Sequence, residues 1–168
     1  MLGLFWRVNR SGAGRAWKAW RAANSCLRFD SVSLRPMTPQ KERRLFETFR
    51  RVFAAHRDRP FAPVTKGMRC GDGWFDLLWW LSVIIEKELM ATDEERENGA
   101  LSTVVEVKEV DGVLVFRMEP QSQLTDPIRA AIDAAITESK RTCEVCGGLG
   151  WRQLRHNMTQ TLCADRHR

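Results

Sequence analysis

The chain has 168 residues, of which 43% are hydrophobic and 29% are charged. This composition is typical of a globular protein with one domain, or one domain and an appendage, and it excludes wholesale disorder, a collagen-like repeat and a coiled coil. The net charge of +6 is uneven, because seven of the 27 basic residues but one of the 21 acidic residues lie in residues 1–36. The rest of the chain carries twenty residues of each sign, so its charge does not indicate a polyanion-binding body.

Residues 1–36 differ in kind from the rest of the chain. They hold three of the seven tryptophans and no glutamate, and residues 14–28 can form a basic amphipathic helix. Such a helix would suit a membrane surface or a nucleic acid. The alternative is a poorly ordered extension before a domain that begins at Met37. The sequence therefore predicts three parts: a basic extension at 1–36, a core at 37–142 and a tail at 143–168.

The first two helices are predicted from their start signals and apolar spacing. Thr38-Pro39 is typical of a helix start, and the spacing of apolar residues predicts a helix over 39–56. Asp72 can cap a second, largely apolar helix over 73–90, with Trp74 entering the core. Because a helix amino terminus offers free amides, Asp72 and Trp74 are also candidates for a small-ligand pocket.

A hairpin and a third helix complete the predicted core. The turn dipeptide Asp111-Gly112 between partly alternating segments predicts an antiparallel hairpin over 103–118. Apolar residues at helical spacing predict a helix over 126–141. No apolar run reaches the roughly 20 residues of a membrane span. The predicted fold is α+β: about three helices packed on a small hairpin, followed by a zinc-ribbon or treble-clef-like tail.

The tail contains a metal-binding pattern. Cys143 and Cys146 form a Cys-x2-Cys pair that is followed by two glycines, and Cys163 and His167 come later in the chain. Three thiolates and one imidazole match a structural, tetrahedral Zn²⁺ site with no open position for catalysis. His156 is the alternative fourth ligand. The metal would supply stability that so short a tail cannot gain from burial.

Cys26 and Cys70 fall outside this pattern and are predicted to be free thiols. An odd number of cysteines argues against a disulfide framework, and the start of the sequence lacks the apolar stretch of a secretory signal. These features predict a reducing, cytoplasmic location.

The tail is also basic, since residues 140–168 hold six basic and two acidic residues. With a tryptophan among the arginines, it could contact phosphates and stack on a base; the alternative is an ordinary solvated surface. The candidate nucleic-acid contacts are Lys140, Arg141, Trp151, Arg152 and Arg155. A different class of function, a small metal-dependent nuclease, would instead depend on His156 or Asp165.

Three motifs, taken in order, resemble a group of small uncharacterised proteins encoded by phages and prophages. They are Cys70–Trp74, Val105–Phe116 with Lys108-Glu109 before a glycine turn, and Cys143–Gly147 with a terminal Thr161–Cys163. The resemblance covers about residues 65–168. It implies a protein of the host cytoplasm with a zinc-knuckle end, and it implies no activity. The expected function is therefore non-enzymatic binding, with the tail presented to a protein or a nucleic acid and neither partner favoured.

Overall fold

The computed structural model describes residues 36–93, 102–155 and 157–164. The predicted extension at 1–36 lies outside these residues except for Pro36. The described chain has four α-helices and two antiparallel pairs of strands, so the predicted α+β class is confirmed. The α-helices are α2 (Pro39–Thr48), α3 (Ala54–Asp58), α4 (Phe75–Asp93) and α5 (Asp126–Ser139). The strands are β1 (Thr103–Val110), β2 (Val113–Glu119), β3 (Trp151–Arg155) and β4 (Met158–Leu162).

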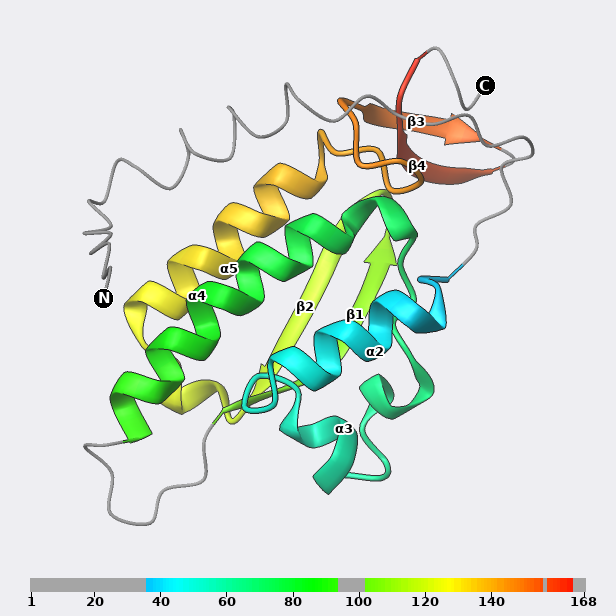
Figure 1. The fold of residues 1–168 in the computed structure, drawn as a ribbon. Coiled ribbons are helices and arrows are strands. Elements are labelled where there is room, and N and C mark those ends of the chain that lie inside the picture. Colours follow the sequence, from blue (N-terminus) through cyan, green and yellow to red (C-terminus); the bar gives the residue numbers. More distant parts are fainter. Residues whose placement is uncertain (1–35, 94–101, 156, 165–168) are drawn as a thin grey trace, which may run out of the picture.

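Helices α4 and α5 run side by side over the β1–β2 hairpin, and α2 lies beside α4 (Figure 1). The core fills the space between these layers. Its large, fully buried side chains include Trp74 directly before α4, Leu78 within α4, Ile128 from α5 and Leu114 from β2. Among the described helices, none is long and apolar enough to span a bilayer.

The first predicted helix is interrupted. A continuous helix over 39–56 was expected, but α2 ends at Thr48 and α3 begins at Ala54. The intervening backbone amides of Arg51 and Val52 donate to the carboxylate of Glu86 on α4, at 3.4 and 3.1 Å. The carboxylate takes the place of the helical acceptors, so a tertiary contact overrides the local helical pattern.

The central hairpin follows the prediction closely. β1 and β2 pair from Thr103↔Glu119 to Val110↔Val113, with a bulge between Val104 and Glu106. Asp111 and Gly112 form the turn, with φ of 52° and 74°. Positive φ at both positions is what a primed two-residue turn requires, and it explains the Asp-Gly dipeptide.

Candidate metal centre

The metal-binding pattern begins in a tight turn after α5. The N–H of Cys143 donates to the carbonyl of Gly148, and the N–H of Gly147 donates to the carbonyl of Cys143, both at 2.8 Å. Gly147 has a φ of 75°, which glycine adopts without the steric cost of a Cβ. The closed turn carries Cys143 and Cys146, and we call residues 143–147 the knuckle.

The β3–β4 hairpin returns the chain to the knuckle. Its register runs from Trp151↔Leu162 to Arg155↔Met158, so Cys163 follows directly after the strand end nearest the knuckle. The N–H of Glu144 donates to the carbonyl of Thr161 at 3.0 Å, which ties the knuckle to β4. The three sulfurs, of Cys143, Cys146 and Cys163, all lie within 4.8 Å of one another. Together, these three cysteines could hold a metal ion.

The electrostatics at Cys143 favour the thiolate that a metal requires. Hydrogen bonds from the Cys146 thiol and from the backbone N–H groups of Cys146, Cys163 and Val145 lower the pKa of Cys143 to about 5, against an opposing effect of burial. A thiolate is the ligand form of cysteine, and donors aimed at the sulfur hold it in place. The donor set therefore fits a thiophilic metal ion, with the ligand oriented before the ion arrives.

Both candidates for the fourth ligand, His156 and His167, lie outside the described residues. The flanking residues Arg155 and Asn157 are described, and they stand at the tip of the hairpin. The choice between His156 and His167 as the fourth ligand therefore stays a prediction.

The motif at 70–74 packs directly against the knuckle. The N–H of Gly73 donates to the carbonyl of Glu144 at 2.7 Å, and the indole N–H of Trp74 donates to the carbonyl of Thr142 at 2.9 Å. A Cβ on Gly73 would lie 2.3 Å from the carbonyl oxygen of Cys143, and one on Gly71 would lie 2.3 Å from that of Glu144. Only glycine permits this approach. The Gly-x-Gly-Trp pattern in the sequence indicates a close backbone approach, but no local feature shows that the knuckle is the segment it packs against.

The structure shows what holds Asp72 and Trp74, the two residues predicted for a small-ligand pocket, and that pocket stays a prediction. Trp74 is fully buried. The carboxylate of Asp72 accepts a hydrogen bond from the N–H of Thr38 at 2.7 Å and lies 3.7 Å from the ammonium of Lys41. Asp72 thus holds the start of α2 and does not cap its own helix, which corrects the predicted capping role.

A second contact joins the hairpin of the tail to the hairpin of the core. The hydroxyl of Thr161 donates to the carbonyl of Gly112 at 2.6 Å, and Nε of Arg152 donates to the carbonyl of Asp111 at 3.0 Å. Leu162 is fully buried. The described part of the tail is therefore packed on the core at two places and is not a loosely attached appendage.

Two buried titratable groups lie close to the knuckle. Burial raises the pKa of Glu144 to about 8, with smaller contributions from Glu109 and Cys143. Burial also raises the pKa of Cys70 far above the ordinary value for a thiol, and Glu144 adds to the effect. Cys70 is a free, protonated and inaccessible thiol, as expected from the sequence.

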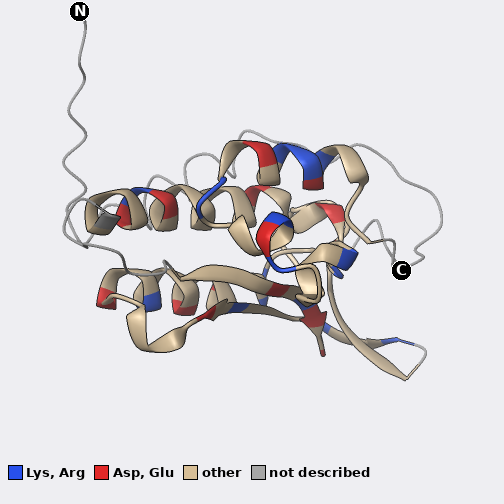
Figure 2. Ribbon diagram, turned by 90° about the horizontal axis from the view of Figure 1, so that it is seen from below, with Lys and Arg blue, Asp and Glu red and all other residues tan. Residues whose placement is uncertain are grey.

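The five candidate nucleic-acid contacts do not gather on one surface. Trp151 and Arg155 lie on one face of the hairpin, and Arg152 points to the opposite face, because side chains alternate along β3. Arg141 pairs with Glu138 through Nε and Oε2 at 2.7 Å, while Lys140 is exposed. In Figure 2, basic and acidic positions are interspersed along the helices. The charge pattern is that of a mixed surface.

Comparisons with protein-family models, curated proteins and solved structures gave no match to this chain.

Proposed function

We propose that this chain is a non-enzymatic binding protein of the phage or prophage type that docks on a protein partner through its C-terminal hairpin. A Zn²⁺ ion held by Cys143, Cys146, Cys163 and His167 would fix that hairpin to the helical core. The reduced thiols of such a site suit the cytoplasm of a bacterial host.

The observation that supports a protein partner is the apolar surface of the hairpin. Leu149 is 69% exposed and Leu154 is 74% exposed, while Trp151 and Met158 are each about half exposed. Trp151 and Met158 lie on one face of the hairpin, and Leu154 lies on the other. Figure 1 places β3 and β4 at the end of the molecule where α4 starts and α5 ends. Large apolar side chains on a fixed projection are the usual anchors of a protein interface.

A nucleic acid fits this surface less well. Arg152 is bonded to the core on the face opposite Trp151, so of the two arginines of β3 one, Arg155, lies on the same face as Trp151, where phosphate contact and base stacking could coincide. The nuclease alternative gains no support either. Its candidate residues His156 and Asp165 lie outside the described part of the chain, and a zinc ion with four protein ligands has no open position for chemistry.

A photoreactive amino acid at position 154 tests the proposal. In extract from a host cell, we expect this variant to crosslink to one protein. The adduct should disappear when the same chain also carries Trp151→Ala. The matched control carries the same amino acid at position 90, because Met90 is an exposed apolar residue of α4 at 51% exposure. Position 90 should give no such adduct.

The nucleic-acid alternative is tested on the same protein by fluorescence anisotropy with single- and double-stranded DNA and RNA. Binding that weakens steeply with salt and is lost in Arg155→Gln, while Leu154→Asp leaves it intact, would overturn the choice of a protein partner. Equal crosslinking at positions 154 and 90 would also overturn it.

A further inference from the structure

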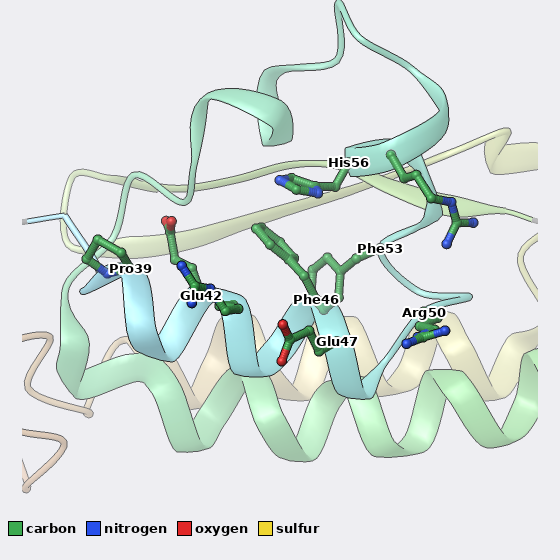
Figure 3. A pocket seen from close by; sticks show the side chains of 9 residues that line it. Pro39, Glu42, Phe46, Glu47, Arg50, Phe53 and His56 are labelled. Atoms are coloured by element: carbon green, nitrogen blue, oxygen red, sulfur yellow. The ribbon is translucent and has the colours of Figure 1, made fainter.

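A groove between α2 and α3 lies away from the tail and has no part in the function proposed above. Its volume is about 420 Å³, which is within the range of small-ligand sites. The lining residues come from successive turns of α2, from the segment between the two helices and from α3 (Figure 3). They are Pro39, Glu42, Arg43, Phe46, Glu47, Arg50, Phe53, His56 and Arg57.

The centre of the groove is an aromatic platform. The ring of His56 stacks on Phe46 with centroids 4.0 Å apart and an angle of 25°, and Phe53 meets Phe46 edge-on at 5.2 Å. Figure 3 shows Phe46 and His56 pointing toward each other across the space between the two helices. Phe46 stacks on the His56 ring, and the exposure of His56 leaves part of this stack open to a planar ligand.

The rim of the groove carries three arginines and two glutamates. Arg57 is paired with its neighbour Asp58 at 2.8 Å, and the carboxylate of Glu42 accepts the N–H of Met68. Within the described residues, Arg43 and Arg50 make no ion pair or hydrogen bond through their guanidinium groups. The groups left for a ligand are therefore two guanidinium groups and the carboxylate of Glu47.

We propose that this groove binds a nucleotide. The base would stack on the platform of His56 and Phe46, the phosphate would pair with Arg50, and Glu47 would accept hydrogen bonds from sugar hydroxyls. Glu47 follows Phe46 near the end of α2, Arg50 lies in the turn just after α2, and all three residues line the same groove (Figure 3). A planar ring, hydroxyl donors and an anionic group occur together in a nucleotide. Inorganic phosphate would leave the aromatic platform unused, and an aromatic acid without hydroxyl groups would leave the carboxylate of Glu47 unused.

The test is a titration of the full-length, isotope-labelled protein with AMP, followed by amide chemical shifts. We expect AMP to shift the signals of residues 42–57 and to bind at least about tenfold more tightly than inorganic phosphate or adenosine alone. His56→Ala and Arg50→Gln should each weaken binding by about tenfold, because each removes a stacking surface or a charged hydrogen bond. Both side chains are exposed, and unchanged thermal midpoints would show that the variants remain folded.

Arg44→Gln is the matched control. Arg44 lies on α2, a few residues before Arg50, but packs over the ring of Trp79 at 4.8 Å, outside the groove. Its substitution should leave AMP binding unchanged. Absence of shifts at millimolar AMP, shifts confined to other residues, or equal loss in Arg44→Gln and Arg50→Gln would each overturn the proposal. A short single-stranded oligonucleotide binding in the groove much more tightly than AMP would identify its ligand as a nucleotide within a strand; equal or weaker binding would identify a free nucleotide.

Discussion

Chelation of the metal is expected to lower the free energy of unfolding of the whole chain by at least about 3 kcal/mol, not only to loosen its last residues. Metal binding contributes directly to folding where the ligands come from a segment with little core of its own. The knuckle and the residue before it supply the acceptors for Gly73 and Trp74, directly before α4, so loss of the knuckle reaches the helical core. Urea unfolding with and without a chelator measures the effect, and added Zn²⁺ should restore the stability.

Cys143→Ser is the matched control for the chelation experiment. It removes the thiolate that the backbone amides stabilise, so this variant should be less stable from the start and insensitive to the chelator. Chelation that leaves wild-type stability unchanged would show that the three cysteines hold no stabilising metal.

Gly73→Ala adds one methyl group, and we expect it to be the most destabilising glycine-to-alanine substitution in the described chain. The new Cβ would lie 2.3 Å from the carbonyl oxygen of Cys143 and within 2.7 Å of the amides of Cys146 and Gly147, and all three contacts are with backbone. Backbone cannot rotate away as a side chain can, so the knuckle must separate from the segment that opens α4. We expect a loss of about 3 kcal/mol or more and a drop in metal affinity of about tenfold to a hundredfold.

The measurements are urea unfolding and competition for metal with a chromogenic chelator. Asp72→Asn is the neighbouring control, because the carboxylate of Asp72 contacts Thr38 and Lys41 and not the knuckle. It should keep the metal affinity of the wild type. A Gly73→Ala protein that matches the wild type in both measurements would contradict the close packing of these two motifs.

The sequence predicted those elements whose signals are local. The apolar helix at α4, the striped helix at α5 and the Asp111-Gly112 turn all lie where expected, because helical periodicity and turn chemistry act within a few residues. The helix over 39–56 was predicted too long. Its interruption depends on Glu86, which is more than thirty residues away and gives no local sign of its role.

The candidate site was predictable in its ligands but not in its surroundings. Cys-x2-Cys followed by glycine, with Cys163 later, sufficed to nominate three residues that the fold brings together. The packing of Gly73 on the knuckle joins positions about seventy residues apart, and a glycine has no side chain to indicate what it touches. Trp151 and Arg152 lie on opposite faces of the hairpin because side chains alternate along a strand. This placement could be assigned only once the bounds and register of β3 and β4 were known.

The metal content of the purified full chain tests most directly whether Cys143, Cys146 and Cys163 hold one metal ion. It is measured by mass spectrometry for the wild type, for Cys146→Ala and, as a control, for Cys26→Ser, whose cysteine lies outside the described residues. We expect one zinc per chain in the wild type and in Cys26→Ser, and none in Cys146→Ala. Equal metal in Cys146→Ala and wild type, or none in wild type purified without chelators, would contradict a metal site at these three cysteines.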